Sequence, residues 1–231
     1  MLNIMAEIVF LGTGSSLENL TKRNAGGFVL KTGDEQIHFD PGPGAAAAAQ
    51  AFGVNIRKTD AIIISKEEPV RNNEWKLIKQ LSDKQPDMIS QDCKKLNKIK
   101  TTKIEKLDYG YKLVARNFTL LYLFKPLTKE MMKKDKLKAD VLILYNKYLN
   151  KGKEELGVED SYKIISALRP KLAVLTGFSS NFRGDKHIQI ARDLKKRTDI
   201  QTVAVDDGTR VDLISYSALS TQRKIFSFVK Q

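Results

Sequence analysis

Cysteine and histidine are scarce in this sequence. Cys93 is the only cysteine among 231 residues, and His38 and His187 are the only histidines. A single cysteine excludes a disulfide within the chain and is typical of a reducing compartment, so we expect a cytoplasmic protein. His38 falls in a predicted strand and His187 in a predicted helix, and we interpret both as structural. One cysteine and two histidines of this kind do not favour a Cys–His catalytic pair.

Long apolar runs are absent as well. The longest strongly apolar run covers about residues 45–52, which is too short to span a bilayer. The first seven residues lack a basic start followed by an apolar stretch, so we expect neither a signal peptide nor a membrane segment. Hydrophobic residues still make up 42% of the chain, enough to bury a sizeable core.

Acidic residues are in short supply, mainly in one part of the chain. The net charge is +13, and residues 94–153 alone contain 17 basic and five acidic residues, a net charge of +12. This basic segment favours a polyanionic partner, because each neutralised phosphate releases condensed counterions. A Lys-rich solvated surface that aids solubility or thermal stability is the alternative, and the charge alone leaves both open.

The basic segment supplies candidate residues for nucleic-acid binding. These are Lys94, Lys95, Lys98, Lys133, Lys134, Lys136 and Lys138. Four aromatic residues lie among the basic ones and are candidates for stacking on bases, with core or edge-strand packing as the alternative. They are Tyr109, Tyr111, Phe118 and Tyr122.

The order of predicted elements indicates an α/β protein. Short apolar or alternating runs predict strands over residues 7–12, 27–32, 36–40, 60–65, 111–115, 118–123, 139–145, 171–176, 201–205 and 210–214. Helices are predicted over residues 45–52, 73–82, 158–168 and 185–197. A strand-rich first half followed by alternating strands and helices predicts a layered domain with helices on the sheet faces.

A Gly-Thr-Gly turn follows the first predicted strand, as it does in dinucleotide-binding loops. Such a loop also needs a third glycine and a helix that begins at the loop. Here Leu17 takes the place of that glycine, and a second strand follows. We therefore reject a dinucleotide site.

The same segments resemble those of metallo-β-lactamase-fold hydrolases, especially a family common in archaea. The segments are IVFLGTGSS, KRNAGGFVL, IHFDPGPGAAAAA and KTDAIIIS, followed later by ADVLILYN, ALRPKLAVLTGF and TVAVDDGTRVDL. The resemblance covers about residues 6–82 and 118–214. It implies a four-layer αββα sandwich with a binuclear metal site at the sheet edges. We expect one such domain over residues 1–231, with a divergent basic segment at about 94–153.

The residues that the resemblance implies as metal ligands are replaced in this chain. Active members continue the DAIIIS strand with Thr/Ser-His-x-His-x-Asp-His, and these imidazoles and carboxylates hold two metal ions and a bridging hydroxide. Lys66, Glu68 and Arg71 stand at the three histidine places. Val70 stands at the aspartate place. The resemblance therefore implies that most of the ligands are lost.

Three further positions complete the comparison with the family pattern. Gly177 replaces the histidine of Thr-His-Phe, and Lys125 takes the loosely aligned place of the bridging aspartate. Asp207 is retained in the Asp-Asp-Gly turn. We accordingly predict no bound metal, no other cofactor and no catalytic residue.

Cations now stand where the metal ligands were. Lys66, Arg71 and Lys125 would neutralise carboxylates left without metal, because an unpaired buried charge costs several kcal/mol. The carboxylates in question are those of Glu68, Asp206 and Asp207. The alternative is that the loop is simply solvated surface.

The leading hypothesis is a pseudoenzyme that keeps the scaffold and binds RNA or an RNA-containing assembly, such as the ribosome or the RNA-processing machinery. The superfamily includes RNA-processing nucleases, which is an argument by analogy only. One alternative is a metal-less scaffold or regulatory subunit with a protein partner. A second is a hydrolase with a rebuilt Mg²⁺ or Mn²⁺ site. Its carboxylates would be Asp40, Glu67, Glu68, Asp206 and Asp207.

Overall fold

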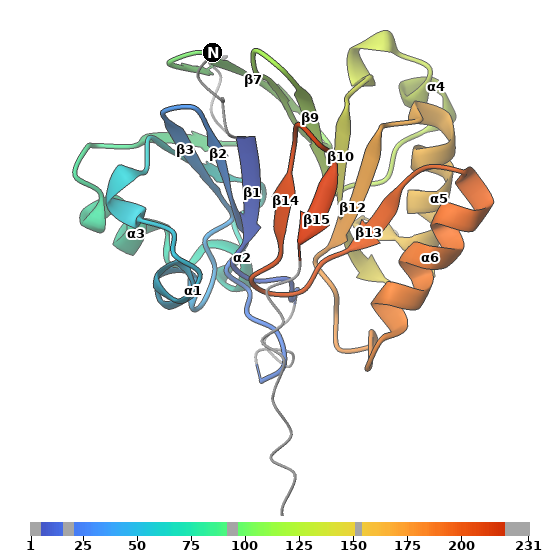
Figure 1. Cartoon of the computed structure of the whole chain (residues 1–231), viewed down its shortest axis with the longest axis horizontal. Coiled ribbons are helices and arrows are strands. Elements are labelled where there is room, and N and C mark those ends of the chain that lie inside the picture. The colour runs from blue at the N-terminus through green and yellow to red at the C-terminus, as the bar shows by residue number, and fades with distance from the viewer. Residues whose placement is uncertain (1–5, 16–20, 92–96, 151–153, 220–231) are drawn as a thin grey trace, which may run out of the picture.

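Two β-sheets pack face to face, and helices cover the outer side of each sheet (Figure 1). The computed structural model describes residues 6–15, 21–91, 97–150 and 154–219. This arrangement confirms the predicted four-layer αββα sandwich. Among the described helices, none is both long and apolar enough to cross a membrane.

The first sheet contains seven described strands. In spatial order they are β15 (Ser217–Leu219), β14 (Arg210–Asp212), β1 (Ala6–Phe10), β2 (Phe28–Thr32), β3 (Glu35–Phe39), β4 (Ala61–Ile64) and β5 (Asp87–Ser90). β3, β4 and β5 run parallel, and the other neighbours pair antiparallel. β2 and β3 form a tight hairpin because Gly33 takes a positive φ of 54° at its turn.

The second sheet holds the other described strands. Across the sheet they are β13 (Thr202–Ala204), β12 (Leu172–Thr176), β10 (Val141–Tyr148), β9 (Thr119–Leu123), β8 (Gly110–Val114), β7 (Thr102–Leu107) and β6 (Asn97–Ile99), while β11 (Leu156–Gly157) pairs with β10. β9, β10, β12 and β13 run parallel. Their carboxyl ends therefore meet at one edge, as in other parallel sheets that hold sites there.

Helices form the two outer layers (Figure 1). The first sheet carries α1 (Ala45–Ala51), η2 (Ile56–Lys58) and α3 (Trp75–Leu81), and the second carries α4 (Lys129–Met132), η3 (Asp135–Leu137), α5 (Val158–Leu168) and α6 (Lys186–Thr198). α2 (Pro69–Asn72) follows β4 at the sheet edge. α5 begins where the Asp160 carboxylate accepts a hydrogen bond from the Gly157 amide, and its buried Ile164 and Ile165 pack on the second sheet.

An aromatic cluster lies in the core between the sheets. The rings of Phe28 and Phe39 stack with centroids 4.4 Å apart, and Tyr122 of the second sheet stands edge-on to both. Edge-to-face and stacked pairs of this kind add to the stabilisation from burial. Tyr122 thus fixes the position of one sheet against the other, close to the site described below.

The sequence predicted most elements but missed part of the basic segment. The helix over residues 158–168 is confirmed at the same bounds as α5. β6 and β7 were not predicted, because Lys and Glu interrupt their apolar pattern, and β5 was missed because its four residues include only two apolar ones.

Candidate functional site

Loops that follow β3, β4, β10 and β12 converge at one edge of the two sheets. Asp40 directly follows β3 with a positive φ of 48°, and its side chain is buried. Its carboxylate accepts hydrogen bonds from Ser65 N at 2.7 Å, Ser65 Oγ at 2.6 Å and Tyr122 Oη at 2.9 Å. Burial raises the pKa of Asp40, although these donors and Arg71 act in the opposite direction.

Arg71 occupies the centre of this edge. It extends from α2, only 3% of its surface is exposed, and its guanidinium lies over the ring of Tyr145 at 3.9 Å from the centroid. One nitrogen donates to Ser65 Oγ at 3.2 Å and another to Glu155, and Nε lies 3.3 Å from Glu68 Oε2. Burial disfavours the charge, but the surrounding oxygens outweigh it and raise the pKa of Arg71.

Two lysines extend this arrangement toward the surface. Lys147 Nζ lies 2.6 Å from Glu155 Oε2, and Lys66 Nζ forms an ion pair with Glu68. Lys66 donates a hydrogen bond to the Glu68 carboxylate, and this bond raises the pKa of Lys66. Burial of Glu68 is outweighed by Lys66 and Arg71, which lower the pKa of Glu68.

Three cations therefore alternate with three carboxylates, and we call this cluster the Arg71 network. Its members are Arg71, Lys66, Lys147, Asp40, Glu68 and Glu155. The expected pairing of Lys66 and Arg71 with Glu68 is present. Lys147 and Glu155 were not among the sequence-predicted residues, because nothing in their spacing links them to Arg71.

Gly177 allows the ring of Tyr145 to pack beside Arg71. A Cβ atom added to Gly177 would lie 2.4 Å from Tyr145 Cδ2, and Gly177 also has a positive φ of 74°. No side chain fits at residue 177 while the ring stays in place. The ring is buried, and burial raises the pKa of Tyr145 to about 12.

The remaining space at this edge is small. The cavity has a volume of about 20 Å³, and its walls include Gly12, Asp40, Arg71, Tyr122 and Tyr145. This volume accommodates about one water molecule. Among the residues that the structure describes, no group of three His, Cys, Asp or Glu side chains is placed to hold a metal ion.

A second polar cluster lies beside the first and contains the Asp-Asp-Gly turn. The Asp207 carboxylate accepts hydrogen bonds from Thr13 N and Oγ1, both at 2.8 Å, and from Asn24 N at 2.6 Å. Burial raises the pKa of Asp207 despite these donors. Asp207 therefore ties the first loop to the turn, and Thr13 and Asn24, its hydrogen-bond partners, are not members of the Arg71 network.

Asp206 pairs with a cation that the sequence analysis missed. Arg23 donates to Asp206 Oδ1 at 2.8 Å and to Thr13 Oγ1 at 2.9 Å, and it packs over Phe178. His187 Nε2 lies 3.0 Å from the same carboxylate oxygen, and the hydrogen bond to His187 lowers the pKa of Asp206. Lys66, Arg71 and Lys125 were expected near Asp206 or Asp207, so that part of the prediction is wrong for this pair. The only available signal was the position of Arg23 in the KRNAGG segment.

Lys125 and Val70 are the remaining residues that the sequence analysis compared with metal ligands of the family. Lys125 is exposed and lies with Lys66, Phe124 and Glu154 around a surface pocket of about 360 Å³ that opens beside Arg71. Val70 belongs to α2, but its side chain lies outside what the structure describes.

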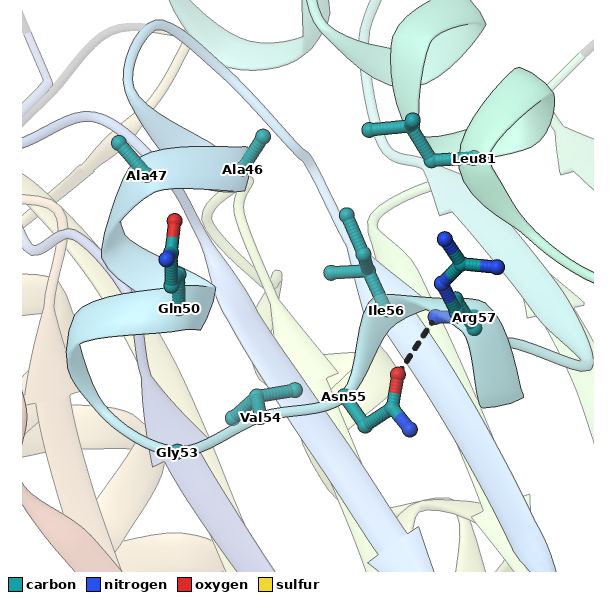
Figure 2. Close-up of a pocket in the computed structure, with 9 residues that line it drawn as sticks. All are labelled: Ala46, Ala47, Gln50, Gly53, Val54, Asn55, Ile56, Arg57 and Leu81. Carbon is teal, nitrogen blue, oxygen red and sulfur yellow. Dashed lines mark hydrogen bonds between the residues drawn. The ribbon is translucent and has the colours of Figure 1, made fainter.

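A different hollow of about 730 Å³ lies on the helical layer of the first sheet (Figure 2). Figure 2 shows α1 residues on one side and Ile56, Arg57 and Leu81 on the other. Its lining contains no carboxylate, histidine or hydroxyl group, and none of the sequence-predicted residues. It therefore offers no catalytic chemistry.

Several described lysines of the basic segment lie on the outer side of the second sheet. Lys98 and Lys103 face each other across β6 and β7, Glu105 and Lys112 do so across β7 and β8, and Lys112 Nζ donates to the carbonyl of Lys136. Lys112 stands opposite Leu121, which packs under α5 and α6, and this places the row on the outer side. Lys94 and Lys95 lie outside the described residues.

The row continues into two grooves beside α4 and the end of α5. The grooves have volumes of about 390 and 420 Å³ and share Lys138 and Leu168. We use the term basic face for the row and the grooves together. Its cationic residues are Lys98, Lys103, Lys112, Lys129, Lys133, Lys134, Lys136, Lys138 and Arg169.

The four aromatic candidates for base stacking are buried. Tyr111 and Tyr122 are at most 1% exposed, and Phe118 and Tyr109 are 3% and 7% exposed. The suggestion that they stack on bases is therefore wrong, and the alternative of core packing holds. Alternation along β8 and β9 directs these rings inward.

Comparisons with known proteins place this geometry in a fold family. No protein-family model matches the chain. An uncharacterized protein of Methanocaldococcus jannaschii is 34% identical over 74 residues, which is 31% of this chain. The match spans only 28% of that protein's length.

Solved structures resemble the chain over most of its length. The metallo-β-lactamase fold protein YhfI from Bacillus subtilis has a TM-score of 0.73 at 11% identity, covering 89% of this chain and 98% of that one. A diphosphatase from the PhnP family has a TM-score of 0.66 at 14% identity, with coverages of 90% and 97%. The short form of human tRNase Z has a TM-score of 0.60 at 16% identity, with coverages of 90% and 99%. This chain has the metallo-β-lactamase fold.

Proposed function

We propose that this chain is a catalytically inactive metallo-β-lactamase-fold protein that binds RNA. The observation that supports the loss of activity most directly is the position of Arg71, whose guanidinium fills the sheet edge together with the ring of Tyr145. The side chains present there do not fit a binuclear metal centre, because the positive charge is supplied by Arg71 itself. Its partners, Glu68 and Glu155, are thereby already neutralised without a metal ion.

Electrostatics explains why such a replacement is stable. A buried carboxylate without a partner costs several kcal/mol, and a cation from the chain removes that cost as a metal would. Asp40, Glu68 and Glu155 each face Arg71 in the Arg71 network. The guanidinium is charged at every accessible pH and presents donors in several directions, so it serves this purpose better than a lysine.

The basic face supports RNA as the partner. Of the carboxylates that the structure describes, none lies within ion-pair distance of Lys133, Lys134 or Lys136. Exposed unpaired cations gathered on one side of a protein favour a polyanion. Tertiary-structure likeness to human tRNase Z and to a yeast long-form RNase Z, at 16% and 13% identity, is consistent with an RNA partner but shows the fold alone.

Elemental analysis of the purified chain tests the first half of the proposal. We expect far less than one zinc, iron or manganese ion per chain after dialysis, since the ligand positions lack imidazole. About two ions per chain would overturn the inactive assignment.

Binding of a labelled RNA of mixed sequence tests the second half. We expect affinity that falls steeply with salt, because phosphate contacts release counterions. The alternative, a scaffold or regulatory subunit, predicts a stable stoichiometric complex with a protein that forms without RNA. Such a complex, together with no salt-dependent RNA binding, would replace the RNA proposal.

A further inference from the structure

The basic face carries more positive charge than the chain itself balances. Lys98 stands directly opposite Lys103, an arrangement of like charges that is unfavourable in a β-sheet, and Glu105 offsets it in part through an ion pair with Lys103 at 2.7 Å. Lys133, Lys134, Lys136 and Lys138 crowd into six residues, and all four are exposed. Only Lys138 among these four has a carboxylate partner, Asp135, in the described part of the chain. A bound polyanion would relieve this repulsion.

The face offers cations but no aromatic surface. The rings of the basic segment that lie nearest to it, such as Tyr109 and Phe118, are directed into the core. Tyr148 is the strongly exposed aromatic residue of the described chain, with 40% of its surface accessible, but it lies at the end of β10 beside the Arg71 network. The described part of the basic face therefore cannot bind by stacking on bases.

The chemistry of the face distinguishes between forms of RNA. Proteins that bind single strands gain much of their affinity from bases stacked on aromatic side chains, and the described face lacks them. A duplex hides its base faces and presents a dense double row of phosphates, which lysines contact as point charges. A face of lysines alone fits the duplex better, and it carries no means of reading the base sequence.

We infer that the basic face binds the phosphate backbone of double-stranded RNA, independently of base sequence. This inference rests on the RNA-binding function proposed above. Lys133, Lys134, Lys136 and Lys138 supply the central contacts: the first two line one groove, Lys138 lines both, and Lys136 lies between them in η3.

The test compares two RNAs that carry equal numbers of phosphates. One is a duplex of about 20 base pairs, somewhat longer than a typical double-stranded RNA-binding domain spans, and the other is single-stranded oligouridine. Fluorescence anisotropy with the full chain between about 50 and 200 mM KCl gives affinity and salt slope. We expect the duplex to bind at least about tenfold more tightly, and two duplexes of unrelated sequence to bind equally.

Charge-reversal variants locate the binding surface. Changing Lys133, Lys134, Lys136 and Lys138 to Glu should weaken duplex binding and reduce the magnitude of the salt slope by about 3–4. The matched control changes four exposed cations of α6, outside the basic face: Lys186, Arg192, Lys195 and Lys196. Arg197 is left intact because it packs over the ring of Tyr162.

The outcomes distinguish failure of the duplex inference from failure of the proposed RNA-binding function. Oligouridine that binds as tightly as the duplex would overturn the duplex inference, and loss of that binding in Tyr148→Ala would point to stacking instead. Duplex binding that the control variant weakens as much as the lysine variant would also overturn it. Absence of binding to either RNA at the lowest salt would overturn the proposed RNA function itself.

Discussion

Lysine and arginine serve opposite purposes in two regions of this molecule. In the Arg71 network every cation has a carboxylate partner, and the charges cancel within the fold. On the basic face Lys133, Lys134 and Lys136 have no such partner among the described residues. Positive charge is therefore neutralised within the fold in one region and remains exposed to solvent in the other. Composition alone does not distinguish the two, because it does not say which cations have carboxylate partners.

The largest expected effect comes from breaking the network at its centre. Arg71→Ala leaves Glu155 and Glu68 without their buried partner, so we expect a loss of about 3–5 kcal/mol in the free energy of unfolding. Urea denaturation measures this loss. Arg71→Met combined with Glu155→Gln removes both charges and should recover part of it in a double-mutant cycle. A loss below about 1 kcal/mol for Arg71→Ala would mean that the network is not buried as described.

The packing beside Arg71 should be nearly as sensitive. Gly177→Ala would force its methyl group into the ring of Tyr145 and keep a strained positive φ, so we expect a loss of about 2–3 kcal/mol. Gly33→Ala is the matched control, since Gly33 also has a positive φ but no atom within 4 Å of the added Cβ. That control should cost only about 1–2 kcal/mol, the strain of the backbone alone. Equal losses in the two variants would show that the ring gives way.

A third, smaller effect concerns the stability of the fold in acid, which we expect to depend on His38 and not on the Arg71 network. His38 is buried, neither ring nitrogen has a hydrogen-bond partner among the described residues, and burial lowers its pKa to about 3 from an ordinary value of 6.5. The His38 ring of the unfolded chain therefore binds a proton below about pH 6.5, whereas the same ring in the folded chain stays neutral down to about pH 3. Stability is full above about pH 6.5 and should fall by about 2 kcal/mol between pH 7.5 and pH 5. Urea denaturation at the two pH values measures it.

A leucine at residue 38 provides the control for the acid effect. His38→Leu keeps an apolar group of similar size and removes the titrating ring, so the difference between pH 7.5 and pH 5 should largely disappear. If the difference persists unchanged in His38→Leu, acid sensitivity comes from other titrating groups, such as Glu68 and Asp206, whose pKa values are lowered in the folded chain.

The smallest effects are expected at exposed charges. Lys66→Gln removes a partly exposed partner of Glu68 and should cost less than about 1 kcal/mol, far less than Arg71→Ala. Changing Lys133, Lys134 and Lys136 to Gln should leave the denaturation midpoint unchanged or raise it slightly, because like charges are removed. A marked loss of stability in that triple variant would show that these lysines have internal partners.

Much of the fold could be predicted from the sequence. The apolar runs that form β1, β4 and β10 are visible without any structure, and α5 begins and ends where its periodicity predicts. β6 and β7 escaped prediction because lysines occupy their outer face, which no helix covers in Figure 1. The places of Lys66 and Arg71 in the family's ligand motif are implied by the resemblance alone and stay a prediction.

The pairing of charges depended on the tertiary structure. Arg71 and Glu155 are 84 residues apart, and they meet only because the edges of two sheets come together. Arg23 meets Asp206 for the same reason, across 183 residues. Each of these ion pairs depends on distances of a few ångströms, and neither spacing nor composition encodes such distances for residues so far apart. By itself the sequence determined most of the strands and helices and the surplus of positive charge in the middle of the chain. Only the tertiary structure decided which cations are used within the fold and which face solvent, because burial and proximity fix the energy of a charge.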